Sequence, residues 1–207
     1  ERVGNDMRML VSDMAGRASI ELKGAELGYD LSTDRALLST IVDRVKVLES
    51  QGYTFEAADA SFELLLREAV EGVRPSFFSV ESWRAITESS PVQDALSEAT
   101  VKLRAGGERV VAVGEGNGPV NALDQALRHA IGQLYPELAK LELVDFKVRI
   151  LDTEHGTDAV TRVLISTSDG ETTWQTVGVG ANVVEASWEA LVDGLVFGLL
   201  RHGQPPR

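Results

Sequence analysis

The chain of 207 residues contains no cysteine, and several other features are scarce. Without cysteine it can hold neither a disulfide framework nor a thiolate metal site. It has 20 Lys and Arg against 32 Asp and Glu, a formal net charge of −12, and therefore lacks the basic face that binds nucleic acid. No apolar run approaches the roughly 18 to 20 residues of a membrane span, and no signal peptide opens the chain. We expect a cytoplasmic protein with no nucleic-acid or membrane partner.

Catalytic and metal-binding motifs are missing as well. The three histidines, His129, His155 and His202, are far apart in the sequence, with no His-x-His or His-Glu-x-x-His. No serine lies in a Gly-x-Ser-x-Gly turn, and no Gly-Lys-Ser/Thr marks a P-loop. Asp124 and Arg128 read as an ordinary surface pair four residues apart. We therefore predict no catalytic residue and no metal ligand in this chain.

What the sequence does contain is a repeat with an offset of 64 residues. Eight of the 22 aligned positions between 106–127 and 170–191 are identical, where chance would give about one or two. The strongest match places Val113-Gly114-Glu115-Gly116 over Val177-Gly178-Val179-Gly180. Two copies are too few for a solenoid, so we predict a pseudo-symmetric pair of units that closes one small domain.

The first third of the chain has a helical pattern. A helix is expected from about residue 17 to 28. A second is capped by Ser32 or Thr33 and stopped by Gly52, and a third is capped by Thr54 and ends before Gly72. We predict that residues 1–74 form helical linker subdomains.

After residue 75 the period shifts towards two, and each half predicts three strands and a helix. The expected strands are 77–86, 95–104 and 108–113 before a helix at 119–134, then 142–151, 159–166 and 172–179 before a helix at 182–201. The predicted fold class is α+β, with the linker subdomains followed by a domain at 75–207. This domain consists of two β-β-β-α repeats, at about 77–134 and 141–201, that form a sheet backed by helices on one side.

The last predicted helix has more apolar surface than one sheet face can cover. Trp188, Val192 and Val196 widen its main apolar stripe. We expect a second buried contact for this helix, with another subunit.

Each repeat carries a strand that ends in a glycine-rich turn and enters a helix. Such a turn leaves backbone N–H groups unpaired at the positive end of the helix dipole, which suits a phosphate or a carboxylate. The candidate anion sites are Gly116-Asn117-Gly118-Pro119 with Asn121, and Gly180-Ala181-Asn182. The alternative is that the glycines only let each strand turn tightly into its helix. The motif is not a dinucleotide fingerprint, because the βαβ context is missing.

Several blocks resemble the C-terminal part of the α-isopropylmalate synthase and citramalate synthase family. The allosteric, or dimer, domain of that family is resembled by Gly156-Thr157-Asp158-Ala159-Val160-Thr161-Arg162-Val163, Thr173-Trp174-Gln175-Thr176-Val177-Gly178-Val179 and Asn182-Val183-Val184-Glu185-Ala186-Ser187-Trp188-Glu189-Ala190-Leu191. Its linker subdomains are resembled by Val3-Gly4-Asn5, Leu10-Val11-Ser12, Ala15-Gly16-Arg17 and Leu48-Glu49-Ser50-Gln51-Gly52-Tyr53-Thr54-Phe55-Glu56-Ala57-Ala58. The similarity spans nearly the whole chain.

The resemblance implies an architecture and a set of partners. In this family the linker joins a (β/α)8 barrel to a regulatory domain that dimerises and binds the end-product amino acid. The barrel, with its divalent metal, is absent from this sequence, which does not begin with Met. We expect a fragment without a cofactor of its own, from an acyltransferase that condenses acetyl-CoA with a 2-oxo acid. Its expected partners are a second copy of the chain, a branched-chain amino acid and its own barrel.

One departure bears on the branch of the family. Where isopropylmalate synthases typically carry His-Ser-Gly-Arg, this chain has Met14-Ala15-Gly16-Arg17. The missing histidine favours the citramalate-type branch, which acts on pyruvate, with the isopropylmalate branch as the alternative. Whether Tyr53 assists the partner's catalytic site stays open.

The resemblance also gives the glycine-rich turn a ligand. Isoleucine or leucine would present its carboxylate to the amides around Gly116 and Gly118. Its side chain would enter an apolar pocket lined from the facing strand by Phe146, Val148 or Ile150, and by Ala159. This is the expected basis of feedback inhibition. The alternative is a dimerisation module that has lost effector binding.

Overall fold

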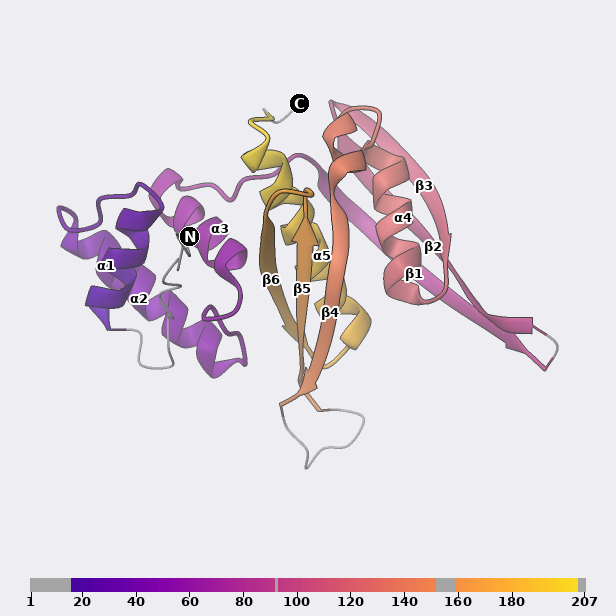
Figure 1. Ribbon diagram of the computed structural model, residues 1–207, viewed down its shortest axis with the longest axis horizontal. Helices are drawn as coiled ribbons and strands as arrows, with labels where there is room; N and C mark the ends of the chain where they lie inside the picture. The colour runs from indigo at the N-terminus through magenta and orange to yellow at the C-terminus, as the bar shows by residue number, and fades with distance from the viewer. Residues whose placement is uncertain (1–15, 92, 152–158, 205–207) are drawn as a thin grey trace, which may run out of the picture.

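The computed structural model describes residues 16–91, 93–151 and 159–204, in which three helices precede two β-β-β-α units (Figure 1). The linker helices are α1 (Arg17–Glu26), α2 (Arg35–Ser50) and α3 (Asp59–Glu71). The first unit contains β1 (Ser79–Ser90), β2 (Gln93–Ala105), β3 (Glu108–Gly116) and α4 (Pro119–Ile131). A short 3-10 helix, η1 (Pro136–Lys140), leads to the second unit, β4 (Glu142–Ile150), β5 (Thr161–Ser168), β6 (Thr173–Gly180) and α5 (Val183–Arg201). The α+β fold class and the order of both repeats are confirmed.

Two of the predicted helix caps are wrong. The carboxylate of Asp34 caps α2, because its Oδ1 accepts hydrogen bonds from the N–H groups of Ala36 and Leu37 at 3.1 and 2.9 Å. Helix α3 begins after Ala58 instead of after Thr54. The chain between these two points is held out of the helix because Phe55 is buried against a ring of α3.

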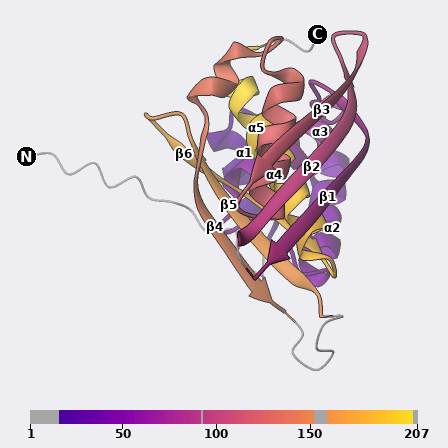
Figure 2. The ribbon, with the colours of Figure 1, turned by 90° about the vertical axis from the view of Figure 1, so that its right-hand side faces the viewer.

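Each unit has its own antiparallel sheet, in the orders β1-β2-β3 and β4-β5-β6. The expectation of one continuous sheet is therefore wrong in the part of the chain that the structure describes. The physical reason is that α4 packs on the first sheet and α5 on the second, and the two helices lie between the sheets (Figure 1; the first sheet faces the viewer in Figure 2). The sheets nevertheless match in register, and their first strands are irregular at equivalent places, between Val80 and Ser82 and between Leu143 and Asp145.

The repeated glycines bring each helix onto its own sheet. A Cβ atom on Gly114 would lie 2.3 Å from the backbone N of Ala126, and one on Gly178 would lie 1.9 Å from the backbone O of Ala186. No other residue type allows so close an approach of helix and strand. Each β-β-β-α unit is therefore a closely packed body.

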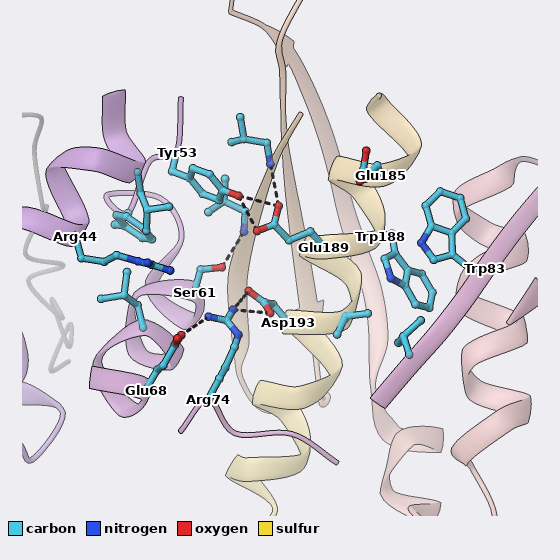
Figure 3. A pocket seen from close by; sticks show the side chains of 17 residues that line it. Arg44, Tyr53, Ser61, Glu68, Arg74, Trp83, Glu185, Trp188, Glu189 and Asp193 are labelled. Carbon is cyan, nitrogen blue, oxygen red and sulfur yellow. Dashed lines mark hydrogen bonds and ion pairs between the residues drawn. The ribbon is translucent and has the colours of Figure 1, made fainter. Parts of the chain in front are cut away.

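Helices α2 and α3 cover the outer face of the second sheet. Val177 of β6 is 1% exposed, and its N–H donates to Ser61 Oγ of α3 at 3.0 Å (Figure 3). The N–H of Gln175 donates to Asp59 Oδ1 at the same distance. Strands β5 and β6 are thus covered on both faces, by α5 and by the linker helices, while β4 at the edge of the sheet is exposed.

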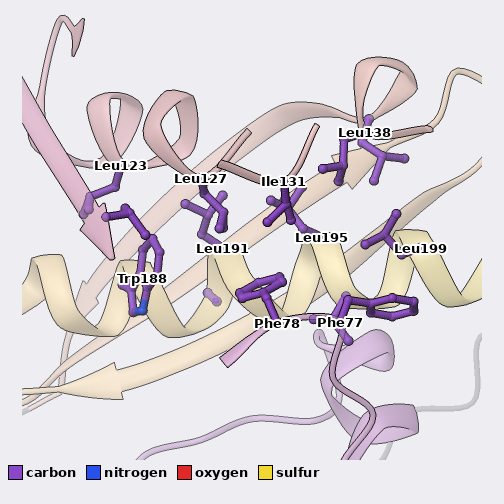
Figure 4. Packing of buried hydrophobic residues seen from close by; sticks show 14 of the residues in the cluster. Phe77, Phe78, Leu123, Leu127, Ile131, Leu138, Trp188, Leu191, Leu195 and Leu199 are labelled. Atoms are coloured by element: carbon purple, nitrogen blue, oxygen red, sulfur yellow. The ribbon is translucent and has the colours of Figure 1, made fainter. Parts of the chain in front are cut away.

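The main core lies where α4 meets α5 (Figure 4). Leu127 and Ile131 of α4 pack with Leu191 and Leu195 of α5, and each of the four is at most 2% exposed. Trp188 and Val196, which widen the apolar stripe of α5, are 9% and 5% exposed, so most of the extra apolar surface is buried within the same chain. The expected contact of α5 with another subunit stays a prediction. None of the described helices is long and apolar enough to cross a bilayer.

Candidate functional site

A hollow of about 810 Å³ lies between α4 and the first half of β4. We call it the α4–β4 groove. Leu141, Leu143 and Phe146 form its apolar side, and the N-terminal turns of α4 form its polar side. The groove brings together five of the residues predicted from the sequence: Asn117, Gly118, Pro119, Asn121 and Phe146.

The N-terminus of α4 opens into this groove without a cap. The helix begins after Gly118 with Pro119, and no side chain in the described part of the chain accepts a hydrogen bond from its first turn. The N–H groups of Val120 and Asn121 are therefore available at the positive end of the helix dipole.

Asp124 and Arg128 form the inner wall. Arg128 Nε donates to both carboxylate oxygens of Asp124 at 2.9 Å, and its Nη1 donates to the carbonyl oxygen of Leu138 at 2.7 Å. Asp124 is only 6% exposed, so the interpretation as a surface pair is wrong. Because these two charges neutralise each other, the groove presents the amide side chains of Asn121 and Gln125 and the carboxylate of Glu142.

The remaining predicted residues of the first site do not line this groove. Gly116 lies behind Asn121, whose Oδ1 would be 2.3 Å from a Cβ at that position. Val148 and Ile150 follow Phe146 along β4 and are 45% and 54% exposed. Ala159 is buried ahead of β5.

The second glycine-rich turn is closed by its own side chain. Asn182 Oδ1 accepts hydrogen bonds from the N–H groups of Val184 and Glu185 at 2.9 and 3.3 Å. The prediction of open amides beside Gly180 and Asn182 is therefore wrong. At the cap position the first unit has Gly118 and the second has Asn182, 64 residues later, and this substitution decides whether the helix start is capped.

A second groove, between α5 and β1, is the structural counterpart of the first. Its walls are Val80 and Trp83 of β1 and Glu185, Trp188, Glu189 and Val192 of α5. These four α5 residues stand 64 positions after Asn121, Asp124, Gln125 and Arg128 of α4, in that order. The strand register makes Trp83 equivalent to Phe146, because Trp83 pairs with Val101 and Phe146 with Ile165.

The α5–β1 groove is narrowed by side chains of the protein itself, with Trp83 and Trp188 side by side (Figure 3). The rings of Trp83 and Trp188 pack together with their centroids 6.0 Å apart. The linker closes the other side, leaving a hollow of about 520 Å³. In each groove, therefore, one unit contributes its helix and the other unit contributes its first strand.

Tyr53 of the linker is anchored on α5. Its hydroxyl donates to the carboxylate of Glu189, with distances of 2.7 and 2.9 Å to Oε1 and Oε2, and the N–H of Val179 donates to Oε2 at 3.2 Å. Burial raises the pKa of Glu189, although these two donors act in the opposite direction. Burial and the neighbouring carboxylate also raise the pKa of Tyr53.

A second anchor lies one turn further along α5. Arg74 Nη2 donates to both carboxylate oxygens of Asp193 at 2.9 and 2.8 Å, and its Nη1 donates to Glu68 of α3 at 3.1 Å. Burial raises the pKa of Asp193, while the guanidinium of Arg74 opposes that shift. The linker is therefore bound to the second unit through charged groups as well as through its core.

Of the two walls of helical residues, the sequence predicted only Asn121 and missed the others. The signal was present, because Asn121, Gln125 and Arg128, spaced three or four residues apart, lie on one face of a helix that starts at the predicted turn. In the described part of the chain, no cluster of three or more His, Asp or Glu side chains is arranged to hold a metal. His155 and Met14 lie outside the described residues.

Comparison with known proteins adds two findings. The family model described as the LeuA allosteric (dimerisation) domain matches residues 56–198. Proteins named (R)-citramalate synthase are similar over nearly the whole chain: that of Streptomyces coelicolor is 66% identical over 206 residues, and that of Synechocystis is 45% identical over 203 residues. The chain covers 39% and 37% of the length of these relatives.

Proposed function

Because this chain belongs to the LeuA allosteric (dimerisation) domain family, we propose that it is the regulatory and dimerisation part of a longer enzyme. Its match to less than two fifths of each relative's length supports this proposal. The names of the relatives favour a citramalate synthase, a cytoplasmic acyltransferase that condenses acetyl-CoA with pyruvate. The catalytic barrel and its divalent metal then belong to the rest of that protein.

The proposed ligand is a branched-chain amino acid, isoleucine or leucine, in the α4–β4 groove. The observation that carries this proposal is the uncapped start of α4 beside an apolar wall. The carboxylate of the ligand accepts hydrogen bonds from the N–H groups of Val120 and Asn121. Its ammonium group donates to Gln125 or Glu142, and its branched side chain packs on Phe146. Because Arg128 already neutralises Asp124, Glu142 is the carboxylate of the groove that remains to pair with the ammonium group of the ligand.

The proposed partner in solution is a second copy of the chain, which covers β4. This strand is at the edge of its sheet and carries a row of exposed apolar side chains, with Val144, Phe146, Val148 and Ile150 each at least 40% exposed. An apolar edge strand left in water promotes association with another chain. A second copy on this row would also enclose the open side of the α4–β4 groove.

Calorimetry with isoleucine and with leucine tests the ligand. We expect saturable binding, and we expect Gly118→Asn to weaken it at least tenfold, because the new side chain caps α4 as Asn182 caps α5. Gly118→Ala is the matched control, since a Cβ there has no neighbour within 4 Å and brings no hydrogen-bond acceptor. No heat at millimolar ligand, from a folded dimer, would leave a dimerisation module without an effector. Gly116→Val is unsuitable, because its Cβ would lie 2.7 Å from the backbone N of Ala122.

Analytical ultracentrifugation tests the partner. We expect a dimer for the unmodified chain and at least tenfold weaker association for Val148→Lys, because the charge would be buried at the interface. Val111→Lys is the control, since Val111 is 52% exposed on the outer face of the other sheet. Equal association of both variants would place the interface elsewhere.

A further inference from the structure

The two grooves connect the same two bodies. Each β-β-β-α unit is packed internally through its glycine, Gly114 or Gly178. The units meet along α4 and α5, and on either side of this contact a helix of one unit faces the first strand of the other. A ligand that separates or draws together α4 and β4 therefore has to change the angle between the units.

The same rotation changes the α5–β1 groove. Trp83 belongs to the first unit and Trp188 to the second, so their contact measures the relative position of the two bodies. Glu189, one residue after Trp188, holds the hydroxyl of Tyr53 at 2.7 Å. The linker leads directly into β1, and Arg74 fixes the crossing segment to α5. The α5–β1 groove is thus the place where both units and the linker touch.

We propose that the α5–β1 groove is a degenerate copy of the α4–β4 groove that senses occupancy of the first groove and passes it to the linker through Trp83, Trp188 and Tyr53. The inference rests on the proposed function for the identity of the ligand, but the mechanical coupling of the grooves does not. Coupling between two sites is reciprocal, so a change made in either groove has to appear in the other.

The first experiment needs no ligand. Hydrogen exchange is measured by mass spectrometry in the whole chain and in Trp83→Phe, which gives β1 the residue that stands at the equivalent place in β4. We expect at least a threefold change in exchange rates at 119–125 and 142–146, although these residues lie in the other groove. Arg84→Ala is the control, because Arg84 lies on the opposite face of β1, with its Nε 3.4 Å from Thr100 Oγ1. A response of Trp83→Phe confined to its own groove would overturn the inference whatever the ligand does.

The second experiment uses isoleucine. The chain has three tryptophans, and Trp174→Phe leaves only the Trp83–Trp188 pair to emit. We expect a saturable change in emission with the midpoint found by calorimetry, and protection of 48–55 from exchange that is lost in Tyr53→Phe. Because the coupling is reciprocal, isoleucine affinity should also change at least twofold in Tyr53→Phe. If isoleucine gives binding heat but changes neither the tryptophan emission nor the exchange of residues 48–55, the inference is overturned, while the proposed ligand is supported. Absence of binding heat would contradict only the proposed ligand, and the hydrogen-exchange experiment on Trp83→Phe would then test the coupling between the grooves.

Discussion

The two β-β-β-α units share a backbone plan but use their equivalent grooves differently. In the first groove the helix start is bare at Gly118 and a single Phe146 faces an open hollow. In the second, Asn182 caps the helix, while Trp83 and Trp188 fill the space. The comparison shows that a duplicated unit can leave the groove of one copy open and use the groove of the other copy for a packing contact. A few side chains decide the difference, because the backbone register is the same.

The largest expected effect concerns what the units share. Gly178→Val forces a Cβ into the backbone of α5 and Gly114→Val does the same with α4, so each should lower the free energy of unfolding by at least about 3 kcal/mol. Gly180→Ala is the control on the same strand, because its Cβ has no neighbour closer than 3.8 Å. Chemical denaturation followed by circular dichroism measures the three variants. A stable Gly178→Val would contradict the equivalence of the two helix contacts.

The next effect separates the two aromatic side chains that stand at equivalent places. Trp83→Ala should cost about 2 kcal/mol of unfolding free energy, because half-buried aromatic area and the contact with Trp188 are lost. Phe146→Ala should cost about 1 kcal/mol or less, because Phe146 is 40% exposed, and should instead weaken isoleucine binding. Thermal denaturation of both variants measures the loss of stability, and calorimetry measures the loss of isoleucine binding. Equal costs of unfolding would mean that both grooves are structural.

A smaller effect is expected at the helix caps. Asn182→Ala removes the acceptor for two N–H groups of α5 and should cost about 1 kcal/mol of stability. Gly118→Asn adds the same cap to α4 and should not lower stability. Denaturation curves of the two variants give both numbers. A stability gain in Asn182→Ala would show that the cap does not distinguish the units.

The smallest effect is a pH dependence located in the second groove. Burial raises the folded-state pKa of Glu189 above its ordinary value of 4.5, so the folded state binds a proton more tightly than the unfolded state. The contribution of Glu189 to stability should therefore fall as the pH rises from about 4.5 through the raised pKa, and be level above it. Glu189→Gln should make this slope shallower, while Gln125→Glu would introduce a new one in the first groove. Urea denaturation at a series of pH values measures both, and an unchanged slope in Glu189→Gln would contradict the prediction.

Much of the fold could be predicted because it depends on local signals. The offset of 64 residues, the turns at Gly106 and Gly170 and the helix starts after the glycine-rich turns all correspond to observed elements. The cap at Thr54 was mispredicted, because burial of Phe55 against α3 overrides the capping preference of a threonine. The coverage of the second sheet on both faces had a weak signal, since β6 carries no charged residue while β3 has Glu108, Arg109 and Glu115.

The candidate site was predictable only on its polar side. A helix start with glycine and proline can be seen in a sequence, and so can an apolar strand that contains Phe146. Which strand closes the groove cannot be seen there, because the apolar side comes from β4 of the other unit, while α4 itself packs on β2 and β3 of its own unit. For the same reason Asp124 and Arg128 read as a surface pair until the chain folds back over them.

By itself the sequence determined two copies of a β-β-β-α unit and the close approach of each helix to its sheet, because those features rest on glycine positions and on periodicity within a few tens of residues. Only the tertiary structure decided that the sheets are separate, that the helices cross between the units and that the linker holds one groove through Tyr53 and Arg74. The linker contacts join residues more than 100 positions apart and the helix contacts join different units, and their stability comes from burial and hydrogen bonding that exist only once both units and the linker are assembled.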